Sequence, residues 1–298
     1  MQEVIFFDVS WALRATQECG RYFPEELLNQ CRSRWPELFP SVMEWCRDGA
    51  CIGVGAPKTA RVVEEAIAFL RQHGREPYLQ KYPSCPYEHP TLYPVGGKRR
   101  FEPKDVDEAE YLILVPQKVI TTDATKDNEG NLSIKRSKVN RQLIGKAFPS
   151  MAPVCKDFLK TEMESEGFNG LAFRSVNLPG TKALVEPVWA MSADREMPAL
   201  LNRIVNDDGT DYEPNENRGC HVDDFYFPSL LRFPAVHVRA MEPFDAAITK
   251  EREHHKWHSH FTPEIVKRFE PFLIVSRRFR KWCDQRKLKI EWWPVVLE

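Results

Sequence analysis

Apolar residues recur with a helical period over residues 58–72 of this chain. They fall on one face at Val62, Ala66, Phe69 and Leu70. Gly74 follows as a typical stop signal, so the pattern predicts a helix that ends near residue 72. The apolar run at residues 4–7 predicts a short strand, and Pro24 stands where the first turn of a helix tolerates proline. We therefore expect residues 1–104 to form a mostly helical N-terminal domain.

Proline and glycine interrupt this pattern between residues 78 and 103. Five prolines fall in this segment, and Gly96 and Gly97 stand next to each other. Such punctuation is typical of an irregular loop or of a junction between domains. We therefore predict a domain boundary near residue 104.

Short extended segments and turn residues dominate after that boundary. The composition of residues 110–115 and 118–122 predicts strands, and a polar turn at residues 127–131 precedes another short extended run at residues 132–135. This order predicts a β-hairpin. The sequence thus indicates an α+β domain over residues 105–298.

An internal repeat is the strongest pattern in this domain. Residues 154–178 and 274–297 share the spacing of their apolar positions. The matched pairs are Leu159 with Phe279, Met163 with Cys283, and Phe168 with Leu288. Each copy predicts an amphipathic helix of about three turns, a tight turn and a strand that buries alternate residues. The alternative explanation is chance similarity between the two segments. If the repeat is real, we expect an α+β fold with two helix-turn-strand units on a mixed or antiparallel sheet.

The composition is that of a soluble globular protein. The chain has 298 residues, of which 42% are hydrophobic and 29% charged, and its net charge of -1 gives no general attraction for nucleic acid or membranes. No apolar run approaches the roughly 18 residues of a membrane span. Glu3 and Asp8 interrupt the apolar N-terminus, so we expect a cytoplasmic protein without a signal peptide. Eight cysteines without a CxxC pair predict reduced, mostly buried thiols.

Five stretches of the C-terminal half carry a resemblance to a known group of proteins. They are residues 166–171 (EGFNGL), 189–193 (WAMSA), 244–251 (FDAAITKE), 272–279 (FLIVSRRF) and 292–295 (WWPV). In this order they resemble the bacterial immunity proteins of the double-CxxCG type and their relatives that lack the cysteines, which accompany polymorphic toxins. The resemblance covers the C-terminal half alone. This chain has no CxxC pair for a zinc ribbon, so we carry over no metal site.

The resemblance implies a cytoplasmic immunity protein that binds one cognate toxin and blocks its active site or its access to substrate. Such a function needs no catalytic residue, cofactor or metal, and we assign none. It needs a rigid surface of about 800 Å² per partner with aromatic or arginine anchors. Candidate anchors are Trp257, Arg277 and the acidic turn at Asp208.

A histidine cluster at residues 254–260 suggests an alternative function, that of a metal-dependent enzyme. His254 and His258 would share one face of a helix at i,i+4 spacing and could bind a metal ion. The HExxH pattern fails, because His255 stands where the glutamate is needed. A polar connection ahead of the next helix start explains the cluster more simply.

A basic run at residues 277–289 suggests a second alternative. Its cations are Arg277, Arg278, Arg280, Lys281, Arg286, Lys287 and Lys289. Cations with interleaved aromatic residues are what single-stranded nucleic acid needs for phosphate contact and base stacking. The helical spacing of Phe279, Trp282 and Cys283 instead favours an apolar stripe that faces the core while the charges face water. A nucleic-acid partner is therefore the less favoured interpretation.

Three further motifs fail on their spacing. Residues 53–59 do not form a phosphate loop, because Pro57 occupies the glycine position before the lysine and has no N–H to donate. The acidic residues 207–213 and 127–130 lack the alternating ligands and the final glutamate of a calcium loop. We also find no GxSxG motif, so catalytic groups would have to come from distant parts of the sequence.

Overall fold

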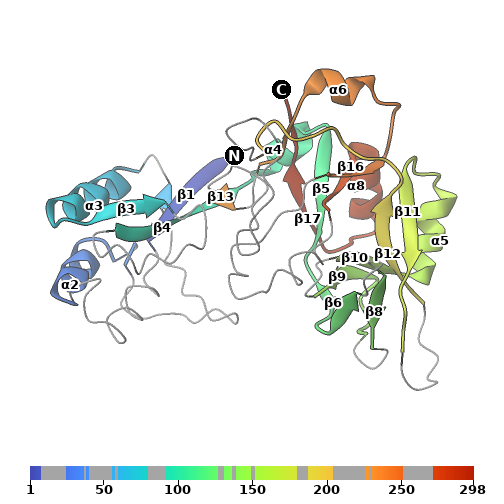
Figure 1. The fold of residues 1–298 in the computed structure, drawn as a ribbon, viewed down its shortest axis with the longest axis horizontal. Helices are drawn as coiled ribbons and strands as arrows, with labels where there is room; N and C mark the ends of the chain where they lie inside the picture. The colour runs from blue at the N-terminus through green and yellow to red at the C-terminus, as the bar shows by residue number, and fades with distance from the viewer. Residues whose placement is uncertain are drawn as a thin grey trace. The chain divides into compact units, whose positions relative to one another are not determined.

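The computed structural model places most of the chain in two compact units (Figure 1). It describes residues 1–7, 25–36, 38–39, 56–57, 60–79, 92–126, 131–135, 139–148, 152–179, 187–203, 226–227, 230–250 and 271–298. Unit 1 comprises residues 1–102 and 224–229, and unit 2 comprises residues 103–223 and 230–298. Both units combine helices with antiparallel or mixed sheets, so the chain is an α+β protein.

A five-stranded sheet forms the centre of unit 1. Its strands are β1 (Gln2–Phe7), β2 (Ala56–Pro57), β3 (Glu76–Leu79), β4 (Leu92–Arg100) and β13 (Tyr226–Phe227). Strand β1 is antiparallel to both β2 and β4, whereas β3 and β13 run parallel to β4. The sheet is therefore mixed, and β1 and β4 make its longest pairing, from Gln2 opposite Arg100 to Phe7 opposite Val95.

Two helices, α2 (Glu25–Arg34) and α3 (Arg61–Gln72), supply most of the core of unit 1. Their buried residues and those just after α2 are Leu27, Cys31, Trp35, Leu38, Phe39, Val63, Ala66, Phe69 and Leu70. The rings of Trp35 and Phe69 meet edge to face, with their centroids 5.4 Å apart. Gly74 follows α3 with a φ of 72°, the left-handed conformation that glycine adopts at a helix end. These elements confirm the helix predicted to end near residue 72, the helix predicted after Pro24 and the strand at residues 4–7.

The prediction of a mostly helical N-terminal portion is not confirmed, because the described part of residues 1–104 contains the sheet as well as the two helices. The irregular loop expected over residues 78–103 is wrong where β4 forms. Gly96 and Gly97 lie opposite Phe6 and Ile5 in the antiparallel register. Because the backbone groups of glycine pair as well as those of other residues, pairing with β1 outweighs the loop preference of this sequence.

Two further sheets organise unit 2. The first has the strand order β15 (Ala246–Ile248), β16 (Leu273–Ser276), β5 (Tyr111–Pro116), β17 (Ile290–Pro294), and all of its pairs are antiparallel. The second has the order β11 (Leu171–Ser175), β12 (Val188–Ala193), β10 (Ala152–Lys156), β9 (Ile144–Ala147), β6 (Val119–Thr121). Only the last of these pairings is parallel. Both sheets contribute to one core cluster, so they belong to a single packed unit.

Smaller elements complete unit 2. They are helices α4 (Pro103–Glu108) and α6 (Ala235–Ala240), the pair β14 (Arg232–Phe233) with β18 (Val296–Leu297), and the pair β7 (Ala124–Lys126) with β8 (Leu132–Ile134). The last pair is antiparallel, with Lys126 opposite Leu132, so a hairpin forms at the predicted turn, but its first strand is Ala124–Lys126 and not the segment 118–122, of which Val119–Thr121 pairs with β9. No helix among the described residues has the length and apolar character that crossing a bilayer requires.

The two segments that share a sequence pattern have the same topology. Residues 154–178 form most of β10, helix α5 (Asp157–Ser165) and β11, and residues 274–297 form β16, helix α8 (Arg277–Gln285) and β17. In each case one strand from elsewhere in the chain separates the pair: β12 lies between β10 and β11, and β5 lies between β16 and β17. Because this middle strand is antiparallel to both neighbours, the outer two run parallel. Each segment is therefore a split β-α-β unit.

The matched positions of the two segments also have matching environments. Leu159, Met163, Phe279 and Cys283 are all buried in one core cluster, to which both α5 and α8 turn their apolar faces. After α5, Gly167 has a φ of 63°, and after α8, Lys287 has a φ of 54°. The same left-handed turn thus ends both helices, although only the first has the glycine that this conformation favours.

Three cysteines of the described residues provide a test of the packing. Cys31, Cys155 and Cys283 are buried and make no disulfide, as the sequence predicted for most thiols. The other five cysteines, at positions 19, 46, 51, 85 and 220, lie outside the described residues. Burial raises the pKa of the Cys31 thiol to about 12, and burial also raises the pKa of the Cys283 thiol. Protonated, enclosed thiols react slowly with alkylating agents.

We expect iodoacetamide at pH 8 to label Cys31 and Cys283 at least tenfold more slowly in the native protein than in urea, a retardation typical of enclosed, protonated thiols. Peptide mass spectrometry after timed quenching measures the two rates at each position. Equal rates in native and unfolded protein at either position would show that its thiol is not enclosed.

Candidate functional site

Several residues that the sequence singled out lie outside the described residues. They are the histidine cluster at residues 254–260, the candidate anchors Trp257 and Asp208, the acidic residues 207–213 and the turn at residues 127–130. Of residues 53–59, only Ala56 and Pro57 are described, as strand β2. The described part of the chain contains no group of three or more His, Cys, Asp or Glu side chains that could hold a metal ion.

The basic run at residues 277–289 forms helix α8 and the turn that follows it. Phe279, Trp282 and Cys283 are buried, which confirms the apolar stripe that their spacing predicted. The arginines on the other faces of the helix bond to neighbouring elements of unit 2. Arg277, the third candidate anchor, donates to the carbonyls of Glu108 and Ala109 at the end of α4. Its role as an anchor for a partner stays a prediction.

Arg280 and Arg286 are engaged in the same way. Arg280 donates to Asp107 at 2.8 Å, and Arg286 donates to Glu162 of α5 at 3.0 Å while its guanidinium lies 4.0 Å from the ring centroid of Trp282. These contacts fasten α8 to α4 and α5. The guanidinium groups are therefore committed within unit 2, which weakens the case for α8 as a surface that binds phosphates.

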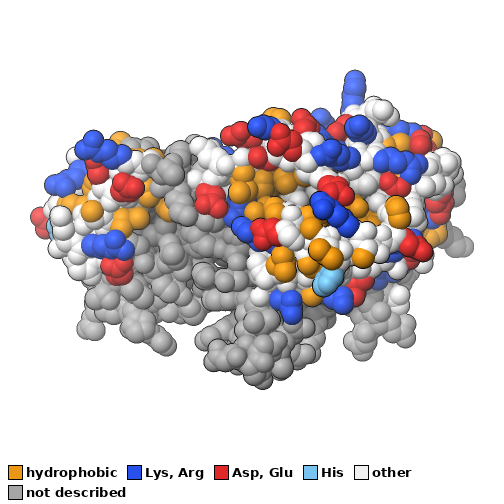
Figure 2. Space-filling view, turned by 90° about the horizontal axis from the view of Figure 1, so that it is seen from above, with side chains coloured by type: hydrophobic (Ala, Val, Ile, Leu, Met, Phe, Trp, Pro, Cys, Tyr) orange, Lys and Arg blue, Asp and Glu red, His pale blue; other side chains and the backbone are white. Residues whose placement is uncertain are grey.

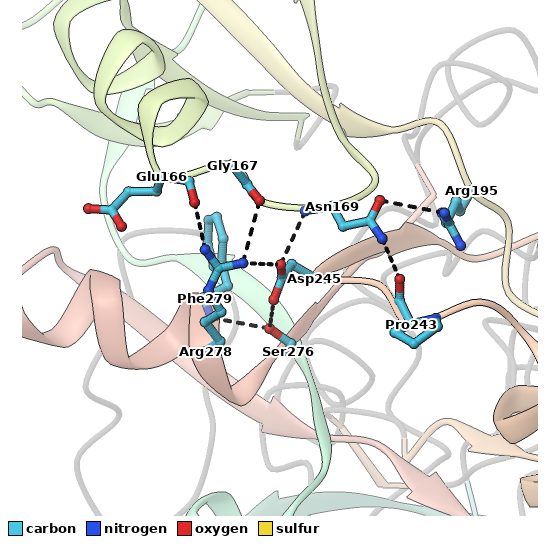
Figure 3. Close-up of polar contacts among 9 residues, drawn as sticks. All are labelled: Glu166, Gly167, Asn169, Arg195, Pro243, Asp245, Ser276, Arg278 and Phe279. Atoms are coloured by element: carbon cyan, nitrogen blue, oxygen red, sulfur yellow. Dashed lines mark hydrogen bonds and ion pairs between the residues drawn. The ribbon is translucent and has the colours of Figure 1, made fainter.

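A carboxylate, Asp245, joins the start of α8 to the turn after α5 (Figure 3). It accepts hydrogen bonds from the Ser276 hydroxyl at 2.6 Å, from the Arg278 guanidinium at 2.6 Å and from the backbone N–H of Asn169 at 3.1 Å. The residue is buried, so these three donors replace the water that the charge would otherwise bind. The Ser276 hydroxyl oxygen in turn accepts the N–H of Phe279, which caps α8.

The turn after α5 sits directly on the backbone before β15. The carbonyl of Asn169 accepts the N–H groups of Asp245 at 2.7 Å and Ala246 at 3.1 Å, and its side-chain amide donates to the carbonyl of Pro243. Gly170 has a φ of 85°, and a β-carbon there would lie 2.4 Å from the Ala246 carbonyl oxygen. Only glycine fits this approach. The turn therefore locks one split β-α-β unit to the other through Asp245.

A tyrosine beside this network is held in its neutral form. Tyr111 stacks on Phe244 with ring centroids 4.6 Å apart. Burial, followed by the charges of Glu110 and Asp245, raises the pKa of its hydroxyl. A phenol is already protonated at neutral pH, so this shift changes no charge there and the contribution of Tyr111 is packing.

A depression of about 410 Å³ lies on the surface of unit 2 over α8 and the turn after α5. Its lining consists of Glu166, Phe168, Arg278, Lys281, Trp282 and Gln285. The guanidinium of Arg278 lies 4.8 Å from the ring centroid of Phe168, and the indole N–H of Trp282 donates to Glu166 at 3.0 Å. Aromatic and arginine side chains held in fixed positions are typical of the residues that dominate protein–protein binding. This depression is the candidate functional site.

Sequence reasoning missed the residues that build this site. Asp245, Asn169 and Ser276 had no assigned role, although all three lie within stretches that carried the resemblance. Two local signals were available: Asn-Gly after an amphipathic helix is typical of a tight turn, and serine before a helix is typical of an N-cap. No local signal indicates that a carboxylate far away in sequence connects the two.

The comparisons with known proteins add nothing to this geometry: no protein-family model, no curated protein and no solved structure matches the chain.

Proposed function

We propose that this chain is a bacterial immunity protein that acts in the cytoplasm, where it binds one cognate toxin and blocks the toxin's active site or its access to substrate. One observation carries the proposal. Three of the stretches that resemble such proteins, residues 166–171, 244–251 and 272–279, contribute Asn169, Asp245 and Ser276 to a single hydrogen-bonded network. These residues lie far apart in the sequence but belong to stretches with the same resemblance, and they support the same surface.

The network also supports the mechanism that an immunity protein requires. Blocking a toxin depends on a surface whose side chains are already in place, because each side chain that must be immobilised on binding costs about 0.5–1.5 kcal/mol. Asp245 fixes Arg278, Arg278 lies over Phe168, and Glu166 fixes Trp282. These contacts order the lining of the depression before a partner arrives.

The proposal is tested by co-expression in bacteria. We expect a toxin domain to be encoded beside this gene, and we expect cells that carry that domain under an inducible promoter to survive induction only when this chain is also expressed. A toxin domain from an unrelated locus serves as the control, and the chain should give no protection against it. The proposal fails if the chain, at comparable expression, does not protect against the neighbouring toxin domain.

A further inference from the structure

We infer that the depression over α8 receives an acidic segment of the protein partner, with Lys281 as its charged contact. This inference rests on the proposed function and adds the place and the chemistry of the contact. It follows from which charges around the depression are neutralised within unit 2 and which are not.

Glu166 is the acidic residue among those that line the depression, and its carboxylate already has partners within unit 2. Glu166 accepts the indole N–H of Trp282 and lies 3.5 Å from Arg286. Asp284 does not line the depression but lies on α8 with Lys281; it pairs with Arg280 at 3.2 Å and accepts the indole N–H of Trp292. These carboxylates have cationic and N–H partners, so neither is available to balance a further charge.

Lys281 differs from the arginines of α8. Its side chain is exposed, it lines the depression, and it makes no ion pair with any residue that the structure describes. By contrast, Arg278, with its side chain 53% exposed, is paired with Asp245 at 2.6 Å. The depression therefore presents one uncompensated positive charge, that of Lys281, beside the paired guanidinium of Arg278. A carboxylate of the partner is the complementary charge, and pairing of this kind determines specificity and speeds association.

The same contacts favour a protein segment over a nucleic acid. Base stacking requires an open aromatic face. Arg278 lies 4.8 Å from the ring centroid of Phe168, and Arg286 lies 4.0 Å from that of Trp282, so guanidinium groups already cover these rings. A volume of about 410 Å³ is also near the lower end of ligand pockets, which span about 300–1,000 Å³. It suits a short protruding peptide segment.

Charge is interspersed on the face of the described residues that Figure 2 shows. On the face shown in Figure 2, acidic and basic side chains alternate among hydrophobic ones, as expected for a chain with a net charge of -1. Attraction at long range is therefore weak. A local uncompensated cation then has more influence on where an acidic partner binds.

The experiment is isothermal titration calorimetry of the full chain with the purified toxin domain encoded beside its gene. We expect Lys281→Glu to raise the Kd at least tenfold, Lys281→Ala to raise it less, and Lys281→Arg to keep it within about twofold, because reversal of a contact charge costs more than its removal. Lys135→Glu, on the β7–β8 hairpin, changes the net charge equally and should leave the Kd unchanged. Because Lys281 is exposed, its three variants should keep the wild-type melting temperature.

Each other outcome has a distinct meaning. If the wild-type chain does not bind the toxin domain, the proposed function fails and this inference fails with it. If the wild-type chain binds and Lys281→Glu binds equally well, the function stands and the assigned site is wrong. Equal losses for Lys281→Ala and Lys281→Glu would overturn the acidic character of the partner segment. Binding of a 20-nucleotide single strand that Lys281→Glu abolishes would overturn the inference in favour of nucleic acid.

Discussion

Replacing Asp245 with alanine should lower the free energy of unfolding of unit 2 by about 3 kcal/mol, because the substitution removes the charged acceptor of two part-buried hydrogen bonds, from the Ser276 hydroxyl and from the Asn169 N–H, and a hydrogen bond to a charged group contributes about 1.5–3 kcal/mol. Arg278 loses its carboxylate as well, but its side chain is half exposed and regains water. The measurement is urea unfolding followed by tryptophan fluorescence, which responds to Trp282 in the core cluster of this unit.

Two variants separate the role of Asp245 from a general loss of charge. Asp245→Asn keeps the shape and one acceptor oxygen, so it should cost less than the alanine variant. Glu196→Ala removes an exposed carboxylate whose partner, Lys250, lies 3.5 Å away, and it should cost less than about 0.5 kcal/mol. If Asp245→Ala unfolds at the same urea concentration as Glu196→Ala, the carboxylate does not hold the two split β-α-β units together.

Gly170→Ala should be the most destabilising single change in this region, at about 3–5 kcal/mol. The left-handed φ of 85° is strained for alanine, and its β-carbon would lie 2.4 Å from the Ala246 carbonyl oxygen, a backbone atom that cannot rotate away. The turn would have to move off the strand, and the hydrogen bonds that the Asp245 and Ala246 N–H groups donate to the Asn169 carbonyl would be lost. Thermal unfolding monitored by circular dichroism measures the effect.

The two turns after the helices provide matched controls for this prediction. Gly167→Ala places alanine at a φ of 63° with no atom within 4 Å of the new β-carbon, so it should cost only about 1 kcal/mol of conformational strain. Lys287→Gly places glycine at the equivalent left-handed position after α8, so it should raise the free energy of unfolding by up to about 1 kcal/mol. Equal effects of Gly167→Ala and Gly170→Ala would show that the close approach to Ala246 is not what requires glycine.

Local periodicity was enough to predict individual elements. The apolar face of α3 and the inward stripe of α8 each depend on residues within one segment, and the structure has them where the spacing placed them. Strand β4 was missed because its Gly96 and Gly97 indicate a loop locally, whereas the pairing that makes them a strand comes from β1. Whether residues 92–100 form a strand is therefore decided by pairing with a segment far away in the sequence.

The difference between local patterns and contacts distant in sequence also explains how much of the candidate site could be predicted. The repeat in residues 154–178 and 274–297 predicted helix, turn and strand, but the pattern contains no information that β12 and β5 separate the outer strands of each unit. Nor could it show that Asp245 receives donors from both units, because each donor looks unremarkable in its own segment. Arg278 and Arg286 were read as solvated charges, and only the packed helices reveal that both are committed to aromatic rings and carboxylates.

The central claim, that the surface of α8 meets the toxin, is tested most directly by lysine acetylation in the free chain and in its saturated complex with the toxin domain encoded by the neighbouring gene. Mass spectrometry reports the acetylation rate at Lys281 and, as an internal reference, at Lys135, whose side chain is 68% exposed. We predict that complex formation slows acetylation of Lys281 at least tenfold, as expected for a lysine enclosed at the centre of an interface, and leaves Lys135 unchanged. An unchanged rate at Lys281 in the saturated complex would contradict the account.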